Sequence, residues 1–304
     1  MPQKAAVTQF KRLYLRRDKI NNVPFFSIME LYLKTKDHSV SQEAFALCWN
    51  KEMDMLITQP CPTDLDPYYQ SGDYISHTDG NASLFERIYQ AVKRINARKK
   101  LQYIDNQIDK PKTLLDIGAG TGDFLQLARS KGFEVQGMEP NAKARGLAVR
   151  KGIDLVPDWE GLSKRKYQYI TLWHVLEHLP DLEKRIKEMT ALLEKDGSLV
   201  VAVPNFRSYD AKHYGPFWAG YDVPRHLWHF SKMAIARIFA AQGLEIVRTD
   251  PMWFDAFYVS LLSEKYKGSQ WAPIKGFWFG LLSNLKALGS KEPSSLIYVL
   301  KRKN

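Results

Sequence analysis

The chain has 304 residues, of which 45% are hydrophobic and 25% charged, a composition typical of a globular protein with a sizeable core. The strongly apolar stretch near its end, residues 276–285, is far shorter than the ~20 residues of a membrane-spanning helix, and the first residues lack the apolar run of a secretory signal. Two cysteines are too few for a disulfide framework, so we expect a protein of a reducing compartment, the cytoplasm.

The formal net charge of +11 admits a nucleic acid, an acidic substrate or a membrane surface as partner. Part of this excess lies at the two ends of the chain, within residues 4–19 and 301–303. Basic tails of this kind are often only solvated, so the charge by itself is weak support for a nucleic-acid partner.

The first third of the chain has no dominant period. Residues 30–80 are mixed, with a proline-containing turn region at 60–67, whereas apolar residues recur at helical spacing over 83–104. Ser83 and Glu86 form a capping-box pattern at the start of that helix. We therefore expect an N-terminal, partly helical appendage over residues 1–104, helical at 83–104, and a second domain over 105–304.

From residue 113 onward, short apolar runs alternate with helical patterns. Strands are expected at 113–117, 134–138, 154–156, 167–173, 198–203, 244–249 and 294–301, and helices at 124–130, 141–151, 181–194 and 231–242. This alternation predicts an α/β fold with a doubly wound, mostly parallel seven-stranded sheet covered on both faces.

A glycine-rich bend follows the first of these strands, in the sequence LLDIGAGTG of residues 114–122. Glycine allows a sharp turn and lets a ligand approach the backbone with no Cβ in the way. The helix that follows offers free backbone N–H groups to a carboxylate or phosphate. The second strand ends in GMEP, so Glu139 falls beside the bend, where its carboxylate can bind both hydroxyls of a ribose.

The bend departs from the nicotinamide-type fingerprint, because Asp123 stands where that pattern has glycine. The residues instead resemble the Rossmann-like S-adenosylmethionine methyltransferases, in the broad group of the ubiquinone and menaquinone methyltransferases. The resemblance covers about residues 68–304 and rests on LLDIGAGTG, GMEP, ITLWHVLEHLPD, DGSLVVAVPN and DVPRHLWHFS. It implies that S-adenosylmethionine is the methyl donor and S-adenosylhomocysteine the product.

The same resemblance implies roles for individual residues. The methionine end of the cofactor would lie against Gly118, Ala119, Gly120 and Gly122. Asp116 would support this bend and Glu139 would hold the ribose. Asp158 or Trp159 would lie near the adenine, and Tyr74 and His77, in DYISH, would belong to an aromatic lid. Trp173 and His174 would face the cofactor, and His178 the substrate pocket.

No metal site is expected. Related proteins often carry a cysteine-rich, zinc-binding segment before the lid, but Cys48 and Cys61 lack a Cys-x-x-Cys pairing. The string HVLEH at residues 174–178 matches an inverted metalloprotease pattern. It opens directly from a strand end beside the cofactor-type bend rather than within a supporting helix, although His174 and His178 would share a face if the stretch were helical.

A second cluster lies in YDVPRHLWHFS, residues 221–231, within a loop at about 205–231 that is placed to bind a substrate. Arg225 is a candidate clamp for a carboxylate or phosphate, and His226 or His229 a candidate base. The alternative is a structured loop whose aromatic residues pack on the sheet. Upstream aromatic residues would suit an aromatic or lipid-like substrate, namely Tyr214, Phe217 and Trp218.

A further aromatic patch, Phe277 to Phe279, admits three interpretations: it lines the pocket, touches a membrane surface, or packs in the core before the last strand. Core packing is the interpretation we favour.

The predicted function is methyl transfer from S-adenosylmethionine to a small-molecule acceptor. His178 is the first candidate base, His226 the second, and the ring of Trp173 could favour the cationic sulfonium. Three alternatives stay open: an RNA- or DNA-directed methyltransferase, a non-catalytic S-adenosylmethionine-binding protein, and a nicotinamide oxidoreductase. The strand end Leu-Trp-His-Val lacks the Asn/Asp-Pro-Pro-aromatic signature of many base-amino methyltransferases.

Overall fold

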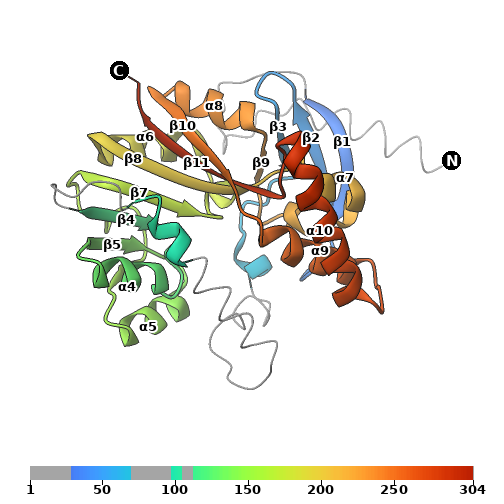
Figure 1. The fold of residues 1–304 in the computed structure, drawn as a ribbon, viewed down its shortest axis with the longest axis horizontal. Coiled ribbons are helices and arrows are strands. Elements are labelled where there is room, and N and C mark those ends of the chain that lie inside the picture. Colours follow the sequence, from blue (N-terminus) through green and yellow to red (C-terminus); the bar gives the residue numbers. More distant parts are fainter. Residues whose placement is uncertain (1–28, 70–96, 105–111, 304) are drawn as a thin grey trace.

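Two β-sheets form the framework of the molecule (Figure 1), in a computed structural model that describes residues 29–69, 97–104 and 112–303. The larger sheet has seven strands in the order β10-β11-β8-β7-β4-β5-β6, and the smaller has four in the order β1-β2-β3-β9. The larger sheet contains β4 (Thr113–Ile117), β5 (Glu134–Met138), β6 (Leu155–Val156), β7 (Tyr167–Trp173), β8 (Leu193–Pro204), β10 (Leu244–Pro251) and β11 (Ser295–Arg302).

The larger sheet confirms the predicted doubly wound α/β fold. Strands β4 to β8 pair in parallel, and only β11 runs antiparallel, against both β8 and β10. All seven expected strands are present, with ends that differ by a few residues. The longest difference is in β8, which starts at Leu193 rather than at residue 198.

Alternate residues of the central strands face two different cores, which is why the strands read as continuous apolar runs. In β8, Leu199 and Val201 join a cluster with helices α6 (Leu182–Leu192) and α8 (Lys232–Ala240). Val200 and Ala202 join a second cluster with α4 (Asp123–Ser130), α5 (Ala142–Arg150) and residues 97–104. Helices therefore cover both faces of the sheet.

The smaller sheet corrects the expectation for the appendage. Residues 29–69 contain strands β1 (Met29–Lys36), β2 (Ala44–Asn50) and β3 (Met55–Gln59), which pair antiparallel with one another and with β9 (Trp228–Phe230). The sequence hid them because β2 and β3 are nearly continuous buried runs without alternation, and their partner β9 is distant in the chain. Ser83, Glu86 and the rest of the expected helix before residue 97 lie outside the described residues, whereas residues 97–101 are helical.

A pair of helices, α9 (Asp255–Tyr266) and α10 (Ala272–Ser290), connects β10 to β11 and was not predicted. Phe277 is 54% and Trp278 61% exposed, so core packing of the aromatic patch was wrong for these two residues. The buried residues of α10 are small ones, including Gly276 and Ser283, so the usual apolar-inside pattern was missing. Among the described residues, no helix is long and apolar enough to cross a bilayer.

The substrate loop expected at 205–231 is a compact, largely buried segment. It contains α7 (Tyr209–Tyr214), the short 3-10 helices η3 (Gly215–Phe217) and η4 (Ala219–Tyr221), and β9. Tyr214 and Trp218 pack in a cluster with Phe45 and Leu47 of the smaller sheet, so they are core residues and not an exposed apolar surface for a substrate.

Arg225 joins this segment to the smaller sheet through a buried ion-pair network. Its Nη2 lies 3.0 Å from Asp37 Oδ1 and 2.6 Å from Asp222 Oδ1, and its Nη1 donates to the Tyr68 carbonyl at 2.9 Å. Burial alone would raise the pKa of Asp37, but Arg225 and the Ser41 N–H hold it well below its usual range. Arg225 is 2% exposed, so the expected anion clamp is instead a structural residue.

We expect Asp37→Ala to lower the free energy of unfolding by about 3–5 kcal/mol, because it leaves the buried Arg225 guanidinium without one of its carboxylates. Urea unfolding followed by circular dichroism measures this change. The matched control is Glu30→Ala, which removes an ion pair to Lys51 whose side chains are 54% and 53% exposed and should cost about 1 kcal/mol or less. Equal effects of the two substitutions would contradict the structural role of Asp37.

Candidate functional site

The glycine bend between β4 and α4 is bonded to the end of the neighbouring strand. The N–H groups of Gly118 and Ala119 donate to the Met138 carbonyl at 2.8 and 2.9 Å. Gly118 and Gly120 have φ of 70° and 56°, a left-handed conformation that favours glycine. A Cβ on Gly118 would come within 2.4 Å of Val175, whereas no described residue has an atom within 4 Å of the same position on Gly120. One side of the bend is therefore packed and the other is open to a ligand.

The carboxylate of Glu139 faces this bend. Its Oε2 accepts from the Gly120 N–H and its Oε1 from the Asn141 N–H, both at 2.9 Å. The parallel β4–β5 register, with Ile117 opposite Met138, brings the two strand ends together. The site thus combines a concave backbone turn with a fixed carboxylate, as predicted from the sequence, while ribose binding by Glu139 stays a prediction.

Two buried side chains support the bend from below. Asp116 is 2% exposed and accepts from the Thr171 hydroxyl at 2.5 Å. Burial raises the pKa of Asp116 to about 7, although the Thr171 hydrogen bond and nearby Lys100 act in the opposite direction. A carboxyl with that pKa is only partly ionised near neutral pH, so it carries less than a full negative charge beneath the bend.

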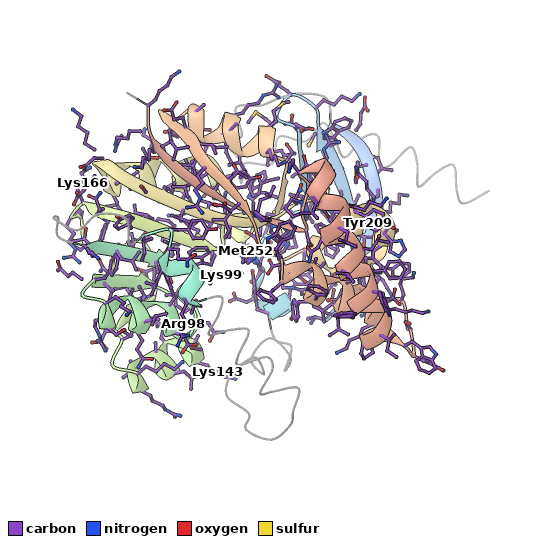
Figure 2. The ribbon with its side chains drawn as sticks, viewed as in Figure 1. Arg98, Lys99, Lys143, Lys166, Tyr209 and Met252 are labelled. Atoms are coloured by element: carbon purple, nitrogen blue, oxygen red, sulfur yellow. The ribbon has the colours of Figure 1, made fainter. Side chains whose placement is uncertain are left out.

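Trp173, at the end of β7, already has a cation on its ring. The Lys100 ammonium lies 4.6 Å from the ring centroid, and Phe124 meets the ring edge-on at 5.6 Å. Lys100 belongs to the segment 97–104, which contacts the residues that follow β10. The Lys99 ammonium lies 5.2 Å from the Phe254 ring, and Figure 2 labels Lys99 and Met252 close together. The expected contact of Trp173 with a sulfonium stays a prediction.

The residues expected near an adenine follow β6 at the same edge of the sheet. The Glu139 N–H donates to the Val156 carbonyl at 2.9 Å, so this strand end adjoins the carboxylate. Asp158 is exposed and accepts from the Gly161 N–H, and Trp159 is half-buried with the Arg185 guanidinium 4.9 Å from its ring. Tyr74 and His77 lie outside the described residues.

His174 directly follows β7 and takes a left-handed conformation with φ of 57°. Because the chain continues into a 3-10 helix, η2 (Leu176–His178), no α-helical face is shared by His174 and His178. His174 Nε2 lies 2.9 Å from Asp255 Oδ2 and Nδ1 lies 3.4 Å from Glu177 Oε1. Burial alone would lower the pKa of His174, but these two carboxylates outweigh it and raise the pKa to about 10.

His178 and His226 face each other with ring centroids 4.5 Å apart. His178 Nδ1 lies 3.1 Å from the Arg225 carbonyl and 3.0 Å from the hydroxyl of Tyr69, in η1 (Asp66–Tyr69), while His226 Nδ1 lies 3.0 Å from the Gly220 carbonyl. A carbonyl only accepts, which favours protons on both Nδ1 atoms and lone pairs on both Nε2 atoms. Burial and the neighbouring His226 lower the pKa of His178 to about 4, so it is a neutral imidazole near neutral pH.

Glu177 lies between the histidines. It is 1% exposed, and apart from the ion pair of Oε1 with His174 Nδ1 at 3.4 Å, its carboxylate oxygens have no hydrogen-bond partner in the described part of the chain. One ligand atom each from Glu177, His178 and His226 lie within 4.8 Å of one another, an arrangement that can accommodate a divalent cation. The sequence predicted no metal, and that stays a prediction.

Hydrogen bonds join the two histidine-containing motifs of the sequence. The Leu227 N–H donates to the Glu177 carbonyl and Trp228 Nε1 to the Leu179 carbonyl, both at 2.8 Å. His229, in contrast, lies 3.0 Å from the Thr58 hydroxyl and is 4% exposed. Burial holds the pKa of His229 well below its usual value, so His229 is a packed strand residue and not the alternative base.

Sequence reasoning missed three contributors to this site: Tyr69, Lys100 and Asp255. They come from three different segments. Tyr69 contacts His178, Lys100 lies over the ring of Trp173, and Asp255 is ion-paired with His174, each of them remote in the chain. No local motif marks them. Glu177, by contrast, could be found from the sequence, because it lies within the HVLEH motif.

The match to known proteins agrees with this geometry. A family model described as a methyltransferase domain matches residues 86–249, more than half of the chain. The chain belongs to this methyltransferase family. The resemblance expected from LLDIGAGTG and the other motifs is thereby confirmed.

Two curated relatives are similar to this protein over part of its length. The ubiquinone biosynthesis O-methyltransferase of Coxiella burnetii is 30% identical over 122 residues, which are 36% of this chain and 52% of that protein. The C-methyltransferase NovU of Streptomyces niveus is 25% identical over 150 residues, 44% of this chain and 33% of that protein. The chain thus spans between a third and about half of the length of these relatives.

Solved structures of methyltransferases share the fold. Magnesium protoporphyrin IX methyltransferase of Synechocystis PCC 6803, solved with bound SAH, has a TM-score of 0.53 at 14% identity, covering 78% of this chain and 97% of that one. Geranyl diphosphate C-methyltransferase of Streptomyces coelicolor A3(2), in complex with Mg²⁺, geranyl diphosphate and S-adenosyl-L-homocysteine, has a TM-score of 0.52 at 13% identity, covering 75% and 88%. The Rossmann-like fold of this family member is confirmed.

We expect Glu139→Ala to weaken binding of S-adenosylhomocysteine by about tenfold or more, because hydrogen bonds to a charged group contribute about 1.5–3 kcal/mol. Isothermal titration calorimetry measures the affinity. Glu134→Ala, on the same strand but ion-paired with Arg165 at the surface, is the control and should leave affinity unchanged. Unchanged affinity in Glu139→Ala would refute the ribose assignment.

The high pKa of His174 predicts a pH-dependent stability. Its folded-state pKa of about 10 lies above the ordinary value of 6.5, so the ion pair with Asp255 stabilises the fold fully below about pH 6.5 and progressively less towards pH 10. The deficit in melting temperature of Asp255→Asn should therefore be largest at about pH 5–6.5, where an ordinary carboxyl is ionised and the imidazole is charged, and shrink as the pH rises towards 10. The exposed Asp154→Asn is the control for scanning calorimetry, and a deficit independent of pH would contradict the charged state of His174.

Proposed function

We propose that this protein transfers a methyl group from S-adenosylmethionine to a small-molecule acceptor. The observation that carries the proposal is the carboxylate of Glu139 bonded to the Gly120 N–H at the open side of the glycine bend. The O- and C-methyltransferases among its relatives support this reaction class.

The residues present fit the methyl donor. The open side of Gly120 admits the methionine end against the backbone, and the two oxygens of Glu139 are placed to accept from the two ribose hydroxyls. When bound, S-adenosylmethionine supplies a methyl group already activated on a sulfonium. The residues assigned to this half of the site are Asp116, Gly118, Ala119, Gly120, Gly122, Glu139, Asp158, Trp159, Trp173 and His174.

The acceptor half of the site lies beside the bend. Val175 packs directly against Gly118, so η2 and its His178 adjoin the strand end that carries the bend. Aligning an acceptor in line with the methyl group contributes about 7–11 kcal/mol in favourable cases. This alignment, together with the exclusion of water, is the main task of these residues.

His178 is the group we assign to proton removal. Its low pKa keeps the imidazole neutral, its Nδ1 is held by the Arg225 carbonyl, and its Nε2 can receive a proton from the acceptor. Glu177, one residue away and buried, favours the resulting imidazolium. His226 is the second candidate.

This assignment gives different proposed roles to the two parts of the chain. We assign residues 105–304 to cofactor binding, with the substrate loop at about 205–231, and residues 1–104 to the appendage and lid. Pairing of β9 with β3 ties the loop to the appendage. We assign the protein to the cytoplasm, because two cysteines are too few for a disulfide framework.

The test is a screen of small-molecule pools with methyl-labelled S-adenosylmethionine, followed by mass identification of the product. A labelled small molecule formed with turnover supports the proposal. Tight cofactor binding without turnover on any pool would favour a non-catalytic binding protein. Labelled RNA or DNA in a parallel reaction would favour the nucleic-acid alternative.

With the acceptor in hand, His178→Asn should lower kcat by about 10²–10⁴-fold if the acceptor loses a proton, and leave S-adenosylhomocysteine affinity unchanged. Because the pKa of His178 is about 4, its loss should lower the rate evenly across the neutral range without moving the pH profile there. The control is His213→Asn, an exposed histidine on α7. An unchanged kcat would remove His178 from the reaction.

A further inference from the structure

Helix α10 has its small residues inside and its large apolar residues outside. Its buried residues are Ala272, Gly276, Gly280, Ser283 and Ala287. A Cβ on Gly276 would come within 2.6 Å of the Leu261 backbone and one on Gly280 within 2.7 Å of the Phe257 backbone. The helix therefore packs closely on α9 through positions without bulk, and its large side chains contribute little to that packing.

The large side chains form one stripe on the other side of the helix, which we call the outer stripe. Its members are Trp271 (63% exposed), Ile274 (53%), Trp278 (61%), Leu285 (55%) and Leu288 (57%). They recur at helical spacing over a length of about 25 Å. Figure 1 shows α10 at the right-hand edge of the molecule, remote from α4 and α5.

Positive charge predominates around the outer stripe: the nearest acidic residues in the sequence are Glu264, which is 2% exposed, and Glu292, which lies 3.3 Å from Lys232. Between residues 265 and 291 the sequence contains no aspartate or glutamate, but five exposed lysines: Lys265, Lys267, Lys275, Lys286 and Lys291. A stripe of tryptophan, isoleucine and leucine with cationic flanks matches a helix that lies in the interface of an anionic bilayer.

From this we propose that α10 docks the protein on an anionic membrane surface, with the outer stripe inserted at the headgroup boundary and the lysines on the phosphates. The helix lies parallel to the surface and does not span it. Charge argues against a second copy as the occupant, because a symmetric contact through the stripe would bring lysines against lysines, and residues 265–291 supply no acidic residue to pair them. This inference is independent of the proposed reaction.

The helix is held firmly enough to act as a docking element. The Asp210 carboxylate, 0% exposed, accepts from Ser283 of α10 at 2.6 Å and from Ser294 before β11 at 2.7 Å. Trp218 Nε1 donates to the same carboxylate at 2.7 Å. Insertion of the outer stripe therefore requires no rearrangement of the side of α10 that packs on the protein.

The test is flotation of the full chain with vesicles of phosphatidylcholine containing phosphatidylglycerol, compared with phosphatidylcholine alone. We expect binding to the first, little to the second, and a decline as salt is raised. Trp278→Gln/Leu285→Gln should reduce partitioning more than tenfold, whereas Val149→Gln/Met233→Gln, equally apolar and 56% and 49% exposed on other helices, should not. Lys275→Gln/Lys286→Gln should reduce it roughly fivefold per lysine, and Lys131→Gln/Lys143→Gln should not.

Three results would overturn the proposal. One is the absence of binding to the anionic vesicles, and another is equal binding by the stripe variant and its control. The third is an oligomer in solution that the stripe variant dissociates, measured by light scattering without vesicles, which would identify the stripe as a contact between copies of this chain. Circular dichroism of both double variants checks that the fold is retained.

Discussion

The guanidinium of Arg225 fixes the relation between the smaller sheet, the segment 215–231 and the start of the site. It is buried together with Asp37 from the end of β1 and bonded to Asp222 and the Tyr68 carbonyl. Its own carbonyl then holds Nδ1 of His178. A buried charge is stable only when paired, so the three segments must meet around it in one arrangement. Arg225, which the sequence suggested as an anion clamp, thus acts instead by fixing the segment that contacts His178.

The carboxylates around His174 give it a charge state different from that of His178 near neutral pH. His174 sits between Asp255 and Glu177, which raise its pKa to about 10 despite its burial. Burial and the neighbouring His226 lower the pKa of His178 to about 4. Near neutral pH the site therefore holds a charged imidazole on His174 and a neutral imidazole on His178. A neutral imidazole can take a proton from a methyl acceptor, and a neighbouring positive charge favours the deprotonated form of that acceptor.

The family match covers residues 86–249, so it includes the bend, Glu139 and all three histidines but not the parts that surround them. Asp37, Tyr69 and Asp255 lie outside it, as do the smaller sheet up to β3 and the helices α9 and α10.

The sequence by itself determined the seven-stranded sheet, the glycine bend and the place of Glu139, because each follows from a contiguous strand–helix–strand unit whose hydrogen bonds and packing are local. Only the tertiary structure decided the smaller sheet, since β3 needs β9 from far along the chain, and the pairing of His174 with Asp255 and of His178 with Tyr69. It also decided the role of Arg225, because an arginine in the sequence can either bind an anionic ligand or form a buried ion pair. The helices α9 and α10 were not predicted, because their contact is made by small residues. The large apolar side chains of α10 are exposed, so its hydrophobic pattern does not mark the buried face.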